Sequence, residues 1–187
     1  MKILKDDHRE TLVQWHETLQ EKRGLRASLR RSKTVNDACL SEGFHSLLMQ
    51  TRTQWKIDGH VWRFTALAVT AALAAHVKSI DDKTSFAEQL GQRTGNNPVM
   101  SELRFSRLSA VKTPDELLRQ LLRAVRLLKG AVNLPSLAED VFQWCREKDE
   151  LLNHIRHRRP LTEFIHVRWA MEYYQAGDAG NDNNNDQ

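Results

Sequence analysis

The clearest signals for the fold lie in TPDELLRQLLRAVRLLKG, residues 113–130. Thr113 is a good N-cap, a proline follows at the first helical position, and Glu116 stands where it can close a capping box. Gly130 follows a lysine at the other end, which is typical of a helix C-terminus. The leucines between these ends recur at helical spacing, so the segment predicts an amphipathic helix with one face in a core.

The rest of the chain also favours helices. Only 8 glycines and 4 prolines occur in 187 residues, and no strand-like alternation is present. Further helices are expected near residues 7–22, 36–49, 58–78, 86–90 and 136–156, and again after Pro160. The sequence therefore predicts an all-α fold with no sheet.

The loop GQRTGNNP, residues 91–98, is the best internal boundary because it concentrates turn-forming residues. We expect two packed helical lobes, an N-terminal one over residues 1–95 and a C-terminal helical bundle over residues 96–176. Residues 177–187 are rich in Asn and Asp and have little to bury. They are expected to form a disordered tail.

Composition narrows the class of protein. Lys and Arg total 28 against 24 Asp and Glu, and three of the aspartates lie in the last eleven residues, so the body of the chain is distinctly basic. Cys39 and Cys145 have neither disulfide nor zinc spacing, which favours a reducing cytoplasm. The N-terminus is too charged for a secretory signal, and the longest apolar run, residues 64–77, is too short to span a bilayer. No membrane partner is expected.

Positive charge is concentrated in three places. The stretch RGLRASLRRS, residues 23–32, carries four arginines, and no acidic residue follows until Asp37. Such a block repels itself unless a polyanion or a set of carboxylates faces it. A helical wheel places Arg119, Arg123 and Arg126 together on the polar side of the 113–130 helix. Like charges at this spacing destabilise a free helix, which favours a bound partner over an ordinary solvated face.

Arg104 and Arg107 form the third group. In the segment MSELRFSRLSAV, residues 100–111, the apolar side chains spread over more than half of the wheel, and both arginines project inside that arc. A guanidinium rooted among apolar groups must extend to solvent or meet an anion. A structural salt bridge and a phosphate contact fit equally well, since the guanidinium fork matches either partner.

The sequence offers little support for catalysis. It contains no GxSxG, HExxH or Walker A motif and no carboxylates spaced for two metals. His45, His60 and His76 are isolated and are expected to be satisfied core residues. His154 and His157 stand three apart without a third ligand, which favours a cationic helix end over a metal site. We therefore expect no enzymatic activity, no metal and no cofactor.

The tryptophans help to choose a binding mode. Platforms for single-stranded bases interleave aromatic and basic residues on one surface. The five tryptophans of this chain instead stand at helical spacings that predict core or interface contacts. We expect contacts with the phosphate backbone, little base reading, and affinity that falls steeply with salt.

The order of several segments resembles the CasB family, the small subunit of the type I-E CRISPR surveillance complex, Cascade. The resemblance extends to about Tyr174. Its segments are a first helix with Trp15, the run RGLRASLRRS, FAEQLG, the run MSELRFSRLSAVKTPDELLRQLLRAVRLLK, a helix with Trp144, and VRWAMEYY. The pieces RASLRR and LRFSRL are the most specific.

The resemblance implies an all-α, non-catalytic subunit with two helical lobes, present as a pair along the belly of a ribonucleoprotein complex. It implies contacts with other Cascade subunits, with guide RNA and target DNA, and with the displaced strand, which would stabilise the R-loop in antiviral defence. The candidate nucleic-acid-binding residues are Arg26, Arg30, Arg31, Arg104 and Arg107 by resemblance, and Arg119, Arg123 and Arg126 by the wheel.

Two alternatives use the same charge differently. A structural adaptor would turn its arginines toward acidic protein partners. A stand-alone helical DNA-binding regulator would need a recognition helix that reads base edges with its N-terminal residues. The acids that follow Thr113 disfavour that second alternative.

Overall fold

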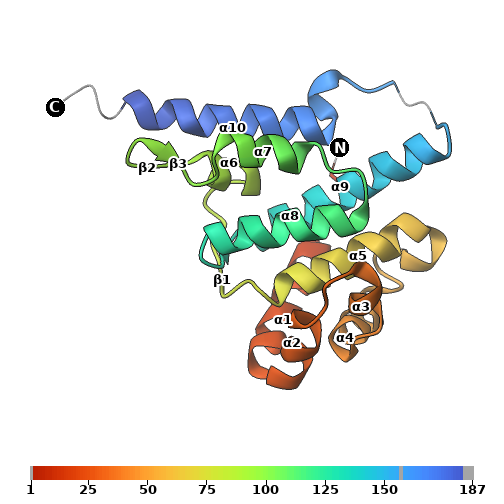
Figure 1. The fold of residues 1–187 in the computed structure, drawn as a ribbon. Coiled ribbons are helices and arrows are strands. Elements are labelled where there is room, and N and C mark those ends of the chain that lie inside the picture. Colours follow the sequence, from red (N-terminus) through yellow and green to blue (C-terminus); the bar gives the residue numbers. More distant parts are fainter. Residues whose placement is uncertain (1, 156–157, 183–187) are drawn as a thin grey trace.

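The computed structural model describes residues 2–155 and 158–182, and nearly all of its regular structure is helical (Figure 1). The α-helices are α1 (Asp6–Glu21), α2 (Arg23–Arg30), α3 (Val35–Cys39), α4 (Glu42–Thr51), α5 (Val61–Ala74), α6 (Phe86–Gly91), α7 (Glu102–Ser109), α8 (Pro114–Leu127), α9 (Leu134–Leu152) and α10 (Ile165–Asp182). Two 3₁₀ turns, η1 (Ile57–Gly59) and η2 (Leu161–Glu163), precede α5 and α10.

The stretch of residues 113–130 forms α8 with the ends that its sequence predicts. The Thr113 side chain accepts a hydrogen bond from the backbone N–H of Glu116, and the Glu116 carboxylate accepts from the N–H groups of Lys112 and Thr113. These bonds lower the pKa of Glu116. At the other end, Lys129 and Gly130 both adopt positive φ, 56° and 85°, which stops the helix.

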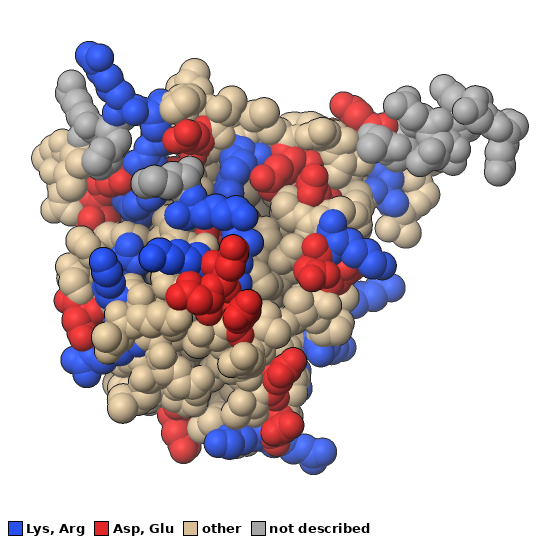
Figure 2. Space-filling model, turned by 180° about the vertical axis from the view of Figure 1, so that it is seen from behind, with Lys and Arg blue, Asp and Glu red and all other residues tan. Residues whose placement is uncertain are grey.

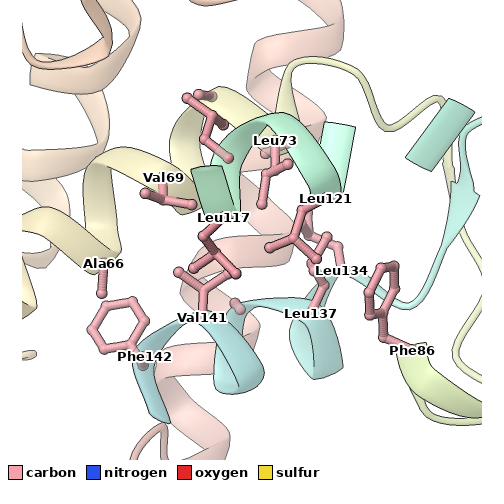
Figure 3. Close-up of a cluster of buried hydrophobic side chains, with 14 of the residues drawn as sticks. Ala66, Val69, Leu73, Phe86, Leu117, Leu121, Leu134, Leu137, Val141 and Phe142 are labelled. Carbon is pink, nitrogen blue, oxygen red and sulfur yellow. The ribbon is translucent and has the colours of Figure 1, made fainter. Parts of the chain in front are cut away.

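The core lies where α5, α8 and α9 meet (Figure 3). Every residue of α5 from Ala66 to Ala74 is buried, which explains why this helix is apolar on all sides. Leu117 and Leu121 of α8 face Leu134, Leu137 and Val141 of α9 in this cluster. Burying a leucine side chain contributes about 1.5–3 kcal/mol, so this contact anchors α8 and fixes the direction of its polar face.

The expectation of no sheet is wrong in two short places. β1 (Ser79–Ile80) pairs in parallel with β4 (Ala131–Val132), and β2 (Arg93–Thr94) pairs antiparallel with β3 (Asn97–Pro98). Each strand has two residues, too few for a visible alternation. The β2–β3 hairpin turns at Gly95, whose φ of +66° suits the first position of a II′ turn. The dipeptide Gly95-Asn96 was the available signal.

The boundary proposed between residues 95 and 96 falls inside that hairpin. α6, which precedes the boundary, packs along α10 at the top of Figure 1. A Cβ added to Gly91 would overlap the carbonyl of Tyr173, so the two helices approach at backbone contact there. Buried residues of both predicted lobes also form one hydrophobic cluster.

The C-terminal helix extends beyond the predicted start of the tail at residue 177. α10 continues to Asp182, and Arg93 Nε donates a 3.0 Å hydrogen bond to the carbonyl of Gly177. Residues 183–187 of the predicted tail lie outside the described residues. In the described part of the chain, no helix combines the length and the apolar character needed to cross a bilayer.

Candidate nucleic-acid interface

Three adjoining grooves run across α2, α8 and α7. The first lies between the end of α2 and α8, the second between α7 and the C-terminal half of α8, and the third joins them over the middle of α8. Neighbouring grooves share arginines, so they form one surface, which we call the arginine groove. Its arginines are Arg30, Arg31, Arg104, Arg107, Arg119, Arg123 and Arg126.

α8 forms the centre of this surface because of its amphipathic sequence. Leu117, Leu121 and Val125 face the core, and Arg119, Arg123 and Arg126 are exposed on the other side. The three arginines therefore lie along one exposed ridge, as the helical wheel predicts. Because α8 is anchored by its buried leucines, the ridge has a fixed orientation relative to α2 and α7.

On α7 the buried face is narrower than the sequence indicates. Phe105 and Leu108 are buried, but Leu103 is 64% exposed. The expectation that Arg104 and Arg107 project inside an apolar arc is therefore wrong, and both are exposed. Within the described residues neither makes the predicted structural salt bridge.

The arginines of α2 divide into two kinds. Arg30 and Arg31 are exposed in the arginine groove. Arg26 is half-buried and donates from Nε to the carbonyl of Ala75 at 3.0 Å and from Nη2 to that of Val77 at 3.5 Å. Those carbonyls lie just beyond the C-terminus of α5, where a cation is favourable. Arg26, a predicted binding residue, is thus engaged in holding α2 against α5.

The chain's own acids neutralise little of the arginine groove, whose third part alone is lined by a carboxylate, that of Glu116 near Arg119. Across residues 2–155 and 158–178, none of its seven arginines forms a salt bridge. Arg119 Nε donates to the Asp115 carbonyl at 3.4 Å, and Arg123 Nη1 donates to the Gln120 side chain at 3.4 Å. The Asp115 carboxylate instead accepts from the backbone N–H of Val35 at 2.8 Å.

The pKa of His76 is affected by its position beside the groove arginines. Burial, together with the charges of Arg30, Arg126 and Arg26, lowers the pKa of His76 from 6.5 to about 4. The imidazole is therefore neutral at pH 7. The expectation that it is a satisfied core residue is wrong, because it is half-buried at the groove and accepts or donates no hydrogen bond to the described residues. Its position just after α5 gave no sequence signal.

Some arginines outside the groove are paired with carboxylates. Arg159 contacts Glu147 at 3.6 Å and Glu150 at 2.5 Å, and Arg168 pairs with the buried Asp140. Figure 2 shows the face opposite to that of Figure 1, where basic and acidic side chains are intermixed. The arginine groove differs from this mixed surface because no carboxylate intervenes between its α2 and α8 arginines.

Of the predicted cationic helix end, Arg156 and His157 lie outside the described residues. Arg158 is exposed beside the paired Arg159. Among the residues that are described, no three His, Cys, Asp or Glu side chains come together as metal ligands would.

The tryptophans lie in or against the core, as their spacing predicts. Trp15, Trp55, Trp144 and Trp169 are buried. Trp62 is half-buried, stacks edge-on against Phe142 and carries the Arg63 guanidinium 4.7 Å from its ring centre. None of them lines the arginine groove.

These features define a small helical protein with an unpaired arginine surface suited to a polyanion. The sequence model of the family described as CRISPR-associated protein Cse2 matches residues 25–174. The chain therefore belongs to the Cse2 family, also called CasB, of type I-E Cascade. Membership makes it a subunit of that CRISPR complex in antiviral defence. Comparison with curated proteins and with solved structures finds no match.

Proposed function

We propose that this subunit binds the nucleic-acid backbone within Cascade through the arginine groove and stabilises the R-loop and its displaced strand. The seven exposed arginines supply charge without base-reading geometry, so recognition is independent of sequence. R-loop formation exchanges one duplex for another of similar stability. A modest number of backbone contacts is therefore enough to shift the balance.

The observation that carries the proposal is the absence of any salt bridge to these arginines within the described residues. Seven guanidinium groups line one surface, and the charges of Arg30 and Arg126 add to the effect of burial in lowering the pKa of the neighbouring His76. Such a field repels cations and attracts polyanions. Guide RNA and target DNA supply the phosphates.

The proposed role involves no catalytic step and no cofactor. Two copies of the chain side by side would extend the groove along a strand, and the other Cascade subunits would hold them in place. The cytoplasm, where guide RNA and invading DNA meet, is the compartment in which this function operates.

The test compares two triple variants in reconstituted Cascade. One changes Arg119, Arg123 and Arg126 to Ala. Its control changes Lys2, Arg52 and Lys83 to Ala, which removes the same formal charge from exposed positions outside the groove. Binding to labelled target DNA is measured over a salt series. The groove variant should lose about 0.7 from the salt slope for each lost single-strand contact, hence about 2 in total.

The control should keep the wild-type slope. If the groove variant keeps the wild-type affinity and salt slope, Arg119, Arg123 and Arg126 do not belong to the interface. If the wild-type chain assembles normally into Cascade but the isolated chain does not bind DNA even at low salt, the result would favour an acidic protein as the partner of the arginines.

A further inference from the structure

The α2 end of the arginine groove contains two neutral polar side chains among its cations. Ser32 follows α2, and His76 follows α5; both line the groove beside Arg30 and Arg126. The remaining cations around them are Arg31, Lys33, Arg119 and Arg123, and Arg26 also acts on His76. No carboxylate lines this part of the groove.

Ser32 has an unsatisfied hydroxyl. The residue is 7% exposed, and its Oγ is buried without a hydrogen-bond partner in the described part of the chain. A buried hydroxyl without a partner costs about 1–3 kcal/mol. The neighbouring backbone does not need this hydroxyl, because the N–H of Ser32 donates to the Leu29 carbonyl at 3.0 Å. A ligand oxygen that accepts from Oγ would remove the cost.

His76 complements Ser32 chemically. A neutral imidazole carries one N–H donor, and the described residues provide it with no acceptor. An additional arginine at this position would increase the repulsion within the groove, whereas a neutral donor adds a hydrogen bond without adding charge. Donors without acceptors, surrounded by cations, match an acceptor-only anion.

We propose that Ser32 and His76 form the floor of a seat for one phosphodiester group, with Arg30 and Arg126 neutralising its charge. The inference rests on the proposed function and refines it. The ridge of α8 supplies general attraction along the strand. The seat fixes the register of one phosphate relative to α2, α5 and α8.

A seated phosphate changes the titration of His76. Its negative charge offsets the surrounding arginines but not the burial that is the larger cause, so the pKa of the imidazole rises from about 4 part of the way toward its ordinary 6.5. The bound state then holds more protons than the free state between these values. Affinity therefore increases as pH falls through this window and is independent of His76 titration above it.

The first experiment follows the histidine ring signals of the full chain by NMR as pH is lowered. The titration is done free, with saturating single-stranded DNA of unrelated sequence, and with inorganic phosphate at the same phosphate concentration. Comparison with His76→Phe assigns the signal. DNA should raise the His76 pKa by at least about one unit, and inorganic phosphate should raise it much less.

The second experiment uses variants that remove a donor and keep the charge. Ser32→Ala and His76→Phe should each weaken DNA binding about threefold to tenfold, the effect of one hydrogen bond, with the salt slope unchanged. His45→Phe, at an exposed position on α4, is the matched control and should bind as the wild type does. Thermal unfolding verifies that each variant is folded.

DNA binding with an unmoved His76 pKa would overturn the seat and leave the proposed function intact. An equal shift with inorganic phosphate would assign the seat to the free ion. Absence of DNA binding by the wild type would overturn both proposals. A reduced salt slope in Ser32→Ala would contradict the neutral role, because it would indicate displaced arginines.

Discussion

The arginine groove and the junction of α9 with α10 contain the same kind of residue in opposite states. In the groove, arginines are exposed and form no salt bridge among the described residues. At the junction, the Arg159 side chain is 10% exposed and lies between Glu147 and Glu150, which are 11% and 14% exposed. Arg168 meets Asp140, whose side chain is 2% exposed. One region keeps its charge available, whereas the other neutralises it internally.

Arginine content alone therefore does not identify a nucleic-acid surface. A buried pair must offset the desolvation of two ions, and loss of one partner leaves the other charge without compensation. Exposed arginines remain hydrated and contribute little to the stability of the free chain. Substitutions at the junction should therefore affect folding, and substitutions in the groove should affect binding.

The largest effect is expected from Arg159→Ala. The variant removes the cation that Glu147 contacts in a poorly hydrated site, so the free energy of unfolding should fall by about 3 kcal/mol. Urea denaturation measures the loss. Arg158→Ala, one residue away and exposed, should change it by less than about 0.5 kcal/mol. An equal loss of unfolding free energy in the two variants would contradict the claim that paired arginines stabilise the fold more than exposed ones.

Asp140 gives the next effect, and it depends on pH. Burial raises the pKa of Asp140 from 3.8 to about 7, although Arg168 lowers it. The folded state thus binds a proton more tightly than the unfolded state, so this stability is present below pH 3.8 and is lost as pH rises through about 7. Relative to Asp140→Asn, the wild type should lose up to about 1.4 kcal/mol for each pH unit across that window. Parallel pH profiles of the two proteins in chemical denaturation would contradict this assignment.

Arg26→Ala should show which of the two regions Arg26 belongs to. Loss of its hydrogen bonds beyond the end of α5 should reduce stability by about 1 kcal/mol. If Arg26 is structural, the salt slope of DNA binding will stay at the wild-type value. A reduced slope with unchanged stability would place it with the groove instead.

The smallest effect on stability is expected from Gln120→Glu. This variant places a carboxylate in the groove, where it can pair with Arg123. A carboxylate beside Arg123 should stabilise α8 by about 0.3 kcal/mol. If one phosphate contact is neutralised, DNA affinity should fall about fivefold at 0.1 M salt, with about 0.7 less salt slope. Gln50→Glu, at an exposed position on α4, is the control for net charge and should leave the slope unchanged.

Much of the fold was predictable because its signals are local. The capping box of α8, the apolar α5 and the glycine after α8 each act within a few residues, and all appear as predicted. The two small sheets could not be predicted from alternation. β1 and β4 pair between loops far apart in sequence, and two residues per strand carry no periodicity.

The sequence predicted the arginines of the candidate site but not its neutral residues, Ser32 and His76. The ridge of α8 followed from helical geometry. The predicted apolar face of α7 is too wide because it includes Leu103, and an apolar side chain need not be buried. The places of Ser32 and His76 depend on how α2, α5 and α8 meet, which is a property of tertiary packing.

The pairing of β1 with β4 determines when the arginine groove can form during synthesis of the chain. The N–H groups of Lys78 and Ser79 both donate to the Gly130 carbonyl, at 2.8 and 3.3 Å, which joins the end of α5 to the end of α8. A nascent chain exposes the α2 arginines long before Gly130 leaves the ribosome. Closing so distant a contact is slow compared with forming local helices. The complete groove therefore arises late, and an unfinished chain presents a basic segment without a shaped surface to the surrounding RNA.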